Sequence, residues 1–276
     1  MLKLKSYFVI GASYGTAAKL IKFDKYYNEV FNQDYKKLLK GYEFKSIQFL
    51  KKDMFLFAHA YNKKEKNFTI SGVKLDRKTG EPMGEMQELA NFQLEDKKDD
   101  FEFSFTPTPD STTWMLVGNI STDVRSTIVI QTFDEKLKKK GAASRINLSF
   151  APNTFDLEDV LQTVDGKYLL MGQKFEMVPT GKKNKTTRTF SHYIFTKYDN
   201  KGKKEMELPV DMQSKYVTSA KAIYFPNGEL LLSGFYSKEP KKKEVNGVYI
   251  NRINVNSGSV ISSAFKEINA NMLDQG

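Results

Sequence analysis

The chain of 276 residues contains no cysteine, a single tryptophan and only two histidines, His59 and His192. The absence of cysteine excludes a disulfide framework, a zinc-thiolate site, an iron–sulfur cluster and a cysteine nucleophile. Two histidines leave little for a histidine metal cluster, and calcium-loop spacing is absent. No run of about 18 apolar residues occurs, so the sequence predicts no membrane-spanning helix. We therefore expect neither a metal ion nor a cofactor.

The start of the chain carries no export signal, because the apolar stretch 7–10 is too short for the core of a signal peptide. Two expectations stay open on this evidence: a cytosolic protein, or the interior of a longer exported one. The length fits one large domain or two small ones.

One short apolar pattern recurs five times in the sequence. Each copy is a run of large apolar residues that closes on Gly or Ala, and the copies lie at 7–11, 54–58, 114–118, 168–172 and 230–234. The closing residues recur about every 56 positions. Gly or Ala at this point is expected near the crowded central axis of a propeller, where neighbouring blades approach closely.

Further strand signals surround each run. An alternating apolar–polar segment follows it and ends at Asp or Asn, which open turns. In four of the five units another strand precedes the run, separated from it by turn residues such as Asp165-Gly166 or Asn227-Gly228. Four short antiparallel strands at this period are typical of a β-propeller blade. A β-sandwich is the alternative, and the fivefold recurrence in register argues against it.

The sequence thus predicts an all-β protein, a β-propeller of about five four-stranded blades in a single domain. The approximate blade boundaries are 1–43, 44–100, 101–154, 155–215 and 216–276. The first unit lacks the strand that precedes the run elsewhere, and the tail after residue 268 is too short and polar to replace it. The chain is therefore either a five-bladed ring with an imperfect seam or a fragment of a larger propeller, and we favour the fragment slightly.

The segments 165–172, 194–202 and 227–234 carry a resemblance to known proteins. They resemble the β-propeller domains of secreted and periplasmic proteins of the Bacteroidota. The WD dipeptide and the paired glycines of kelch repeats are absent. The resemblance implies an exported protein, periplasmic or at the cell surface, that binds something, and it carries over no active-site residue.

Charge gives a first candidate site. The chain has 43 Lys+Arg and 33 Asp+Glu, a net charge of +10, but its lysine clusters fall in loops predicted on both faces, which makes nucleic-acid binding unlikely. Two long inserts, 176–189 and 237–246, fall in consecutive blades on one face, so we expect them to be neighbours. Their basic residues form the predicted binding rim: Lys182, Lys183, Lys185, Arg188, Lys241, Lys242 and Lys243.

Three aromatic residues are predicted to join this rim. Tyr61, Phe175 and Tyr236 come just after the apolar run in three different units. Rings at this point could stack together on a sugar or a peptide.

Catalytic residues are not evident. Carboxylates on or near the predicted inner strands are Asp156, Glu158, Asp159, Glu102 and the group Glu95, Asp96, Asp99 and Asp100. The equivalent positions of other blades carry Lys45, Ser46, Thr218 and Ser219, so no ring of acids forms and solvated connectors are the favoured interpretation. For His59, a core position with a satisfied hydrogen bond is favoured over a catalytic one.

These observations favour a non-enzymatic binding or scaffolding propeller at the cell envelope, with a protein as its partner. The alternative is a glycan-binding or glycan-hydrolysing propeller, whose catalysis would require two carboxylates about 5–10 Å apart. Binding of nucleic acid or an anionic surface through the loop lysines is the third and weakest hypothesis.

Overall fold

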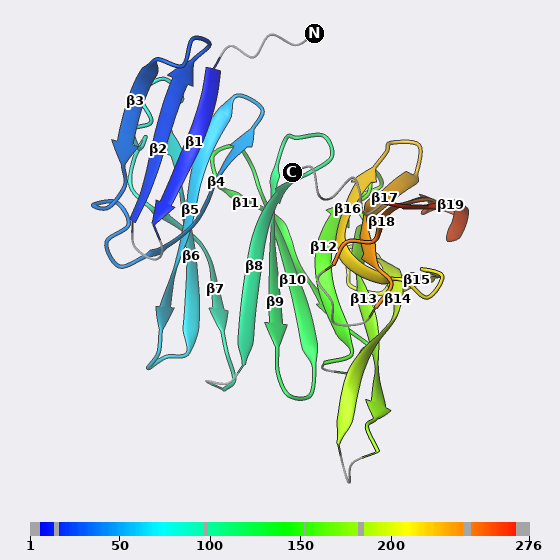
Figure 1. Ribbon diagram of the computed structural model, residues 1–276. Helices are drawn as coiled ribbons and strands as arrows, with labels where there is room; N and C mark the ends of the chain where they lie inside the picture. The colour runs from blue at the N-terminus through cyan, green and yellow to red at the C-terminus, as the bar shows by residue number, and fades with distance from the viewer. Residues whose placement is uncertain are drawn as a thin grey trace. The chain divides into compact units, whose positions relative to one another are not determined.

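The computed structural model describes residues 6–13, 17–96, 99–151, 153–181, 185–239 and 244–268, and every regular element within them is a β-strand (Figure 1). In chain order the strands are β1 (Ser6–Ser13), β2 (Ala17–Asp24), β3 (Glu29–Asp34), β4 (Glu43–Leu50), β5 (Asp53–Asn62), β6 (Asn67–Leu75), β7 (Gln87–Gln93), β8 (Asp100–Pro107), β9 (Trp114–Ser121), β10 (Ser126–Phe133), β11 (Lys139–Asn147), β12 (Phe155–Gln162), β13 (Tyr168–Pro179), β14 (Thr186–Tyr198), β15 (Lys204–Val210), β16 (Tyr216–Tyr224), β17 (Glu229–Ser237), β18 (Gly247–Asn254) and β19 (Ser259–Glu267).

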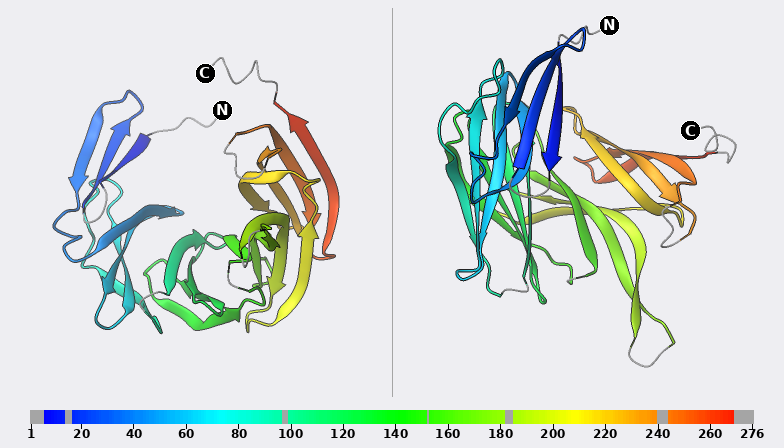
Figure 2. Two further views of the ribbon diagram at one scale, coloured as in Figure 1. Left: turned by 60° about the horizontal axis from the view of Figure 1, so that its bottom comes forward. Right: turned by 60° about the vertical axis from the view of Figure 1, so that its left-hand side comes forward.

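These strands form five antiparallel sheets in which each strand pairs with the next one along the chain. The sheet β1–β3 has three strands, and the sheets β4–β7, β8–β11, β12–β15 and β16–β19 have four each. Figure 2 shows each sheet as a twisted meander. The predicted fold class, an all-β propeller of about five four-stranded blades, is confirmed.

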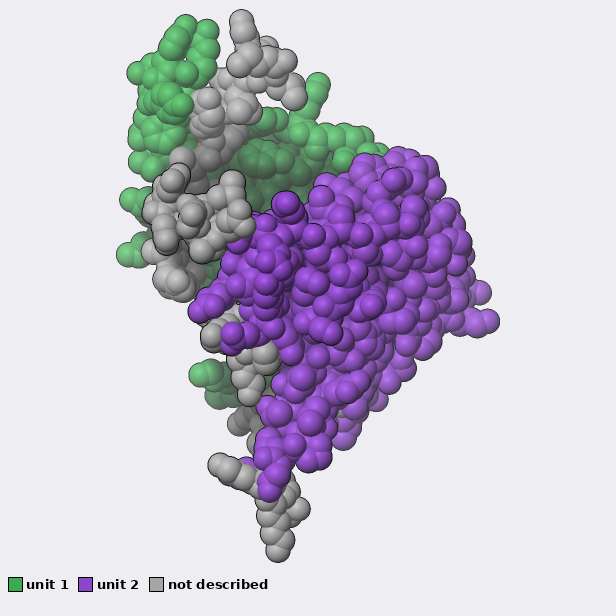
Figure 3. Space-filling view, turned by 45° about the vertical axis from the view of Figure 1, so that its right-hand side comes forward, with its two compact units in different colours: residues 1–122, 129–143 green, residues 123–128, 144–276 purple. Residues whose placement is uncertain are grey.

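The chain divides into two compact units, which Figure 3 colours green and purple. Unit 1 comprises residues 1–122 and 129–143, and unit 2 comprises residues 123–128 and 144–276. The largest core of unit 1 is rich in phenylalanine and surrounds Trp114, which is fully buried. The core of unit 2 lies between the sheets β12–β15 and β16–β19 and contains Leu169, Met171, Leu230 and Leu232.

A polar residue ends or directly follows the third strand of each four-stranded sheet and the second strand of the sheet β1–β3. Each of these side chains accepts hydrogen bonds from two backbone N–H groups of the following turn. The five residues are Asp24, Asp76, Asp134, Asp199 and Asn254. These bonds satisfy backbone donors that the tight turn would otherwise leave unpaired. The predicted turn role is confirmed for the four aspartates, whereas in the last unit Asn254 accepts the turn hydrogen bonds and not Asn256, where the sequence predicts the strand to end.

Bulges in the first strands explain two of the glycines. The pairing of β12 with β13 shifts so that Glu158 is an extra residue, and the pairing of β16 with β17 shifts at Thr218. A Cβ atom on Gly172 would lie 2.0 Å from the carbonyl oxygen of Asp156, and one on Gly234 would lie 2.0 Å from that of Ser219. The bulged strand of the same sheet therefore requires these glycines, not the approach of a neighbouring blade.

The insert 176–189 is not a loop. Residues 176–179 and 186–189 extend β13 and β14 into a long hairpin, with pairs such as Met177↔Arg188 and Pro179↔Thr186. In Figure 1 this hairpin projects beyond the other strands of its sheet. Arg188 therefore lies on a paired strand of this hairpin.

Candidate ligand-binding cavity

Unit 2 contains a cavity of about 770 Å3 between the sheets β12–β15 and β16–β19. Its walls come from β13, β14, β16 and β17, with Glu239 and Val245 added from the segment after β17. Both predicted inserts therefore contribute to one cavity.

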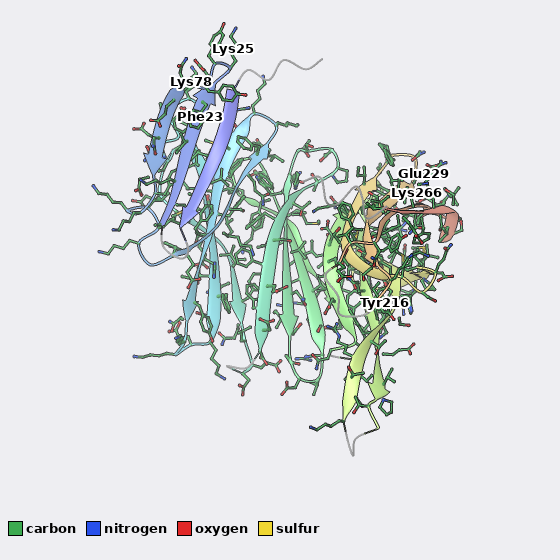
Figure 4. The ribbon with its side chains drawn as sticks, viewed as in Figure 1. Phe23, Lys25, Lys78, Tyr216, Glu229 and Lys266 are labelled. Carbon is green, nitrogen blue, oxygen red and sulfur yellow. The ribbon has the colours of Figure 1, made fainter. Side chains whose placement is uncertain are left out.

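Three aromatic rings form one wall of the cavity. Phe175 of β13 meets Phe190 of β14 edge to face at 6.1 Å, and Phe190 meets Tyr216 of β16 at 6.1 Å. Tyr216 is labelled in Figure 4. All three side chains are half-buried, so each keeps some apolar surface open to a ligand. The exposed part of such a ring can stack on the apolar face of a ligand.

Arg188 lies against this wall. Its guanidinium carbon is 3.6 Å from the centroid of the Phe175 ring, and its Nη2 is 2.6 Å from Oδ1 of Asp156. The cation is therefore held by an aromatic face and by a carboxylate at once. About a third of the Arg188 side chain (34%) remains exposed.

Glu158, the bulged residue of β12, lies beside the cavity. Its carboxylate accepts hydrogen bonds from Nε2 of Gln173 at 2.5 Å and from the hydroxyl of Tyr193 at 2.6 Å. Gln173 itself lines the cavity. Burial, and then the charge of Glu158, raise the pKa of Tyr193 far above its ordinary range, so the phenol stays protonated and donates.

Two more polar groups complete this region. The Tyr249 hydroxyl donates to the carbonyl oxygen of Ser219 at 3.1 Å, and burial followed by the charge of Glu158 raises the pKa of Tyr249. Burial raises the pKa of the Asp159 carboxyl, against the backbone N–H of Val160 and the charge of Lys221, which lower it. Perturbed groups gathered beside a cavity are typical of functional sites.

The structure places only part of the predicted rim in this cavity. Phe175 and Arg188 line it, whereas Lys185 precedes β14 on the exposed hairpin and is not among the lining residues. Lys182, Lys183, Lys241, Lys242 and Lys243 lie outside the described residues.

Tyr236 is a correction to the predicted aromatic rim. Its side chain is fully buried and packs against Phe265, so it offers no ring face to a ligand. Side chains alternate between the two faces of a strand. Tyr61 and Phe175 stand three residues after the closing Ala58 and Gly172, but Tyr236 stands two after its glycine and therefore points to the opposite face.

Tyr61 belongs to unit 1. It stacks on Phe68 at 4.4 Å and lines a separate hollow of about 610 Å3 at the β5–β6 hairpin, together with polar residues such as Asn62 and Asn91. His59 is half-buried against Phe103, 3.6 Å from Glu43, and burial lowers its pKa. This placement agrees with a core histidine, although its Nδ1 has no hydrogen-bond partner.

Sequence reasoning missed Phe190, Tyr216, Gln173 and Tyr193. Their place in the cavity depends on pairing between strands, and only the recurrence of polar residues one position after the closing glycine could have drawn attention to Gln173.

Among the described residues, no three His, Asp or Glu side chains are grouped to hold a metal ion. None of the described segments is a helix long and apolar enough to cross a membrane.

Comparison with known proteins supports the fold. No protein-family description matches the chain, and no curated protein matches it. A solved polysaccharide lyase, Uly1, is similar with a TM-score of 0.50 at 10% identity, over 96% of this chain and 71% of the lyase. An α-L-arabinanase from Penicillium chrysogenum, solved with arabinobiose, is similar with a TM-score of 0.50 at 11% identity, over 92% of this chain and 86% of the arabinanase.

At such identity the likeness establishes the fold alone. The chain is an all-β protein with the architecture of a β-propeller. Its relation to exported propellers of the Bacteroidota stays a prediction, because no family description matches.

Proposed function

We propose that this propeller binds a glycan in the cavity of unit 2. We therefore favour the alternative given by the sequence, a glycan-binding propeller, over its first hypothesis, a scaffold that binds a protein. The observation that carries it is the aromatic wall of Phe175, Phe190 and Tyr216 beside a fixed set of polar groups. A sugar has an apolar face of C–H groups and a rim of hydroxyls, so its face can stack on the aromatic wall while its hydroxyls bond to the polar groups. The volume of the cavity also lies within the range of about 300–1,000 Å3 that is typical of ligand sites.

The two similar structures support this choice. They are named as a polysaccharide lyase and an arabinanase, both proteins that act on glycans. Because a fold hosts many functions, this support is weaker than that of the cavity itself.

Removal of one ring tests the proposal. The protein is screened against an array of neutral and acidic oligosaccharides that includes arabinobiose, and the best ligand is titrated by calorimetry. Phe175→Ala should weaken binding roughly tenfold, the effect of losing an aromatic contact of about 1.5 kcal/mol. Phe225→Ala is the control, since Phe225 is an exposed ring outside the cavity. Absence of glycan binding, or equal binding by the parent and Phe175→Ala, would contradict the proposal.

A further inference from the structure

Among the described residues, the charged groups that line the cavity or contact its lining residues are mostly carboxylates, unlike those of the chain as a whole. The net charge of +10 suggests an anionic ligand. Among the described residues that line the cavity, however, Arg188 is the one Lys or Arg and Glu239 is a carboxylate, and the Arg188 guanidinium is already paired with Asp156 at 2.6 Å. A cation that a carboxylate neutralises offers little net attraction to a second anion.

Carboxylates stand directly behind the lining residues. Asp156 and Glu158 both belong to β12, and Glu158 reaches the cavity wall through its bond with Gln173. The Glu158 carboxylate accepts hydrogen bonds from Nε2 of Gln173 and from the hydroxyl of Tyr193. A carboxylate has about four acceptor positions, so these two bonds leave room for hydroxyl donors from a ligand.

We infer that the cavity selects neutral, hydroxyl-rich glycans and discriminates against uronate or sulfated ones, and this inference rests on the proposed function. Glu158 and Asp156 present acceptors to hydroxyl groups and repel a ligand carboxylate or sulfate. Repulsion between like charges about 5 Å apart near a protein surface is enough for roughly tenfold discrimination or more. The specificity thus comes partly from a repulsive element and not only from attractive contacts.

A matched pair of ligands tests the inference. The pair consists of oligogalacturonates and the same oligomers after reduction of their carboxyl groups, which have the same sugar backbone but no charge. Both are titrated together with the neutral and acidic members of the glycan array. The inference predicts that the strongest ligands are neutral and that reduction strengthens binding about tenfold.

The outcomes separate the inference from the proposed function. Stronger binding of acidic oligosaccharides that Phe175→Ala abolishes would overturn the selectivity and leave the cavity as the binding site. Stronger acidic binding that persists in Phe175→Ala would overturn the selectivity and place the site elsewhere. No binding of any glycan would overturn the proposed function itself.

A substitution at the ion pair gives a second test. Asp156→Asn frees Arg188 and removes one repulsive charge, so affinity for oligogalacturonate should rise about tenfold while affinity for the reduced oligomer changes less than about threefold. Asp199→Asn is the control: it removes one negative charge from the far end of the same sheet, and asparagine already fills that turn role at Asn254. An equal effect of the two substitutions on acidic oligomers would contradict the assigned role of Asp156.

Discussion

The two units contain corresponding junctions between neighbouring sheets, and the two junctions differ in how closely their aromatic rings pack. In unit 1, Tyr61 stacks on Phe68 at 4.4 Å and Phe68 lies 4.8 Å from Phe101 across the junction. In unit 2, Phe175 and Phe190 occupy the positions of Tyr61 and Phe68, but their contacts lengthen to 6.1 Å and a cavity of about 770 Å3 remains.

The strand register identifies the side chains responsible. In unit 1, Phe103 pairs with the closing Gly118, and Phe101 pairs with Ile120. In unit 2, the residue paired with Gly234 is Ala220, and the residue paired two positions later, with Tyr236, is Val217. Two phenylalanines on the first strand are thus replaced by alanine and valine. The same arrangement of strands thus forms a packed core in unit 1 and leaves space for a ligand in unit 2.

The polar groups at the two junctions differ as well. The bulged residue of the first strand is Lys45 in unit 1 and Glu158 in unit 2. Lys45 lies 4.6 Å from the centroid of the Phe103 ring, whereas Glu158 is fixed by hydrogen bonds beside the cavity. The comparison teaches that a bulge can re-aim a side chain either onto a core ring or toward a ligand site.

The largest expected effect comes from opening the closed junction. Phe103→Ala should lower the free energy of unfolding by about 3 kcal/mol, because Phe103 is only 7% exposed and its removal leaves a cavity. Urea unfolding measures the change, with the exposed Phe225→Ala as the matched control. A loss below about 1 kcal/mol would mean that the ring does not fill the junction as described.

A smaller effect is expected from a difference between two hairpin turns in how their stability depends on pH. In unit 1 the Asp110 carboxylate accepts bonds from Thr108 and Thr112, and these bonds, that of Thr108 first, lower the pKa of Asp110 to about 2. The corresponding turn of β16–β17 uses the neutral Asn227. A carboxyl with a lowered pKa stabilises the fold above the pKa of the unfolded chain, about 3.9, and this contribution is lost as the pH falls toward 2.

Because Asp110 is exposed, solvent screening keeps its contribution below about 1 kcal/mol. Urea unfolding of the parent and Asp110→Asn at pH 5 and pH 2.5 measures it. The parent should lose more stability between these values than the variant does. An identical loss in both proteins would show that the turn carboxylate contributes nothing.

Local patterns made most of the fold predictable. Alternation of apolar and polar residues and the turn residues Asp76, Asp199 and Asn227 act within a few positions, so the sequence reveals them directly. The cavity depends instead on which residues face each other across two sheets. A single extra residue such as Thr218 shifts that pairing without a sequence signature.

The candidate site was accordingly predictable only in part. Phe175 follows from its position after the apolar run and Arg188 from the position of the insert. Tyr236 was misplaced because a difference of one position reverses the face of a strand. Glu158 was visible as a carboxylate, and its partners Tyr193 and Gln173 were not, since they come from two other strands.

The most direct test fills the cavity of unit 2 with an aromatic ring, so that its junction resembles that of unit 1. Val217→Phe places a ring where unit 1 has Phe101, and because the ring enters existing space, the free energy of unfolding should change by about 1 kcal/mol or less. Val164→Phe adds the same ring at an exposed turn and is the control. Calorimetry should show that Val217→Phe loses binding of the best neutral oligosaccharide while Val164→Phe keeps it. Unchanged binding by a folded Val217→Phe protein would contradict the claim that this cavity is the ligand site.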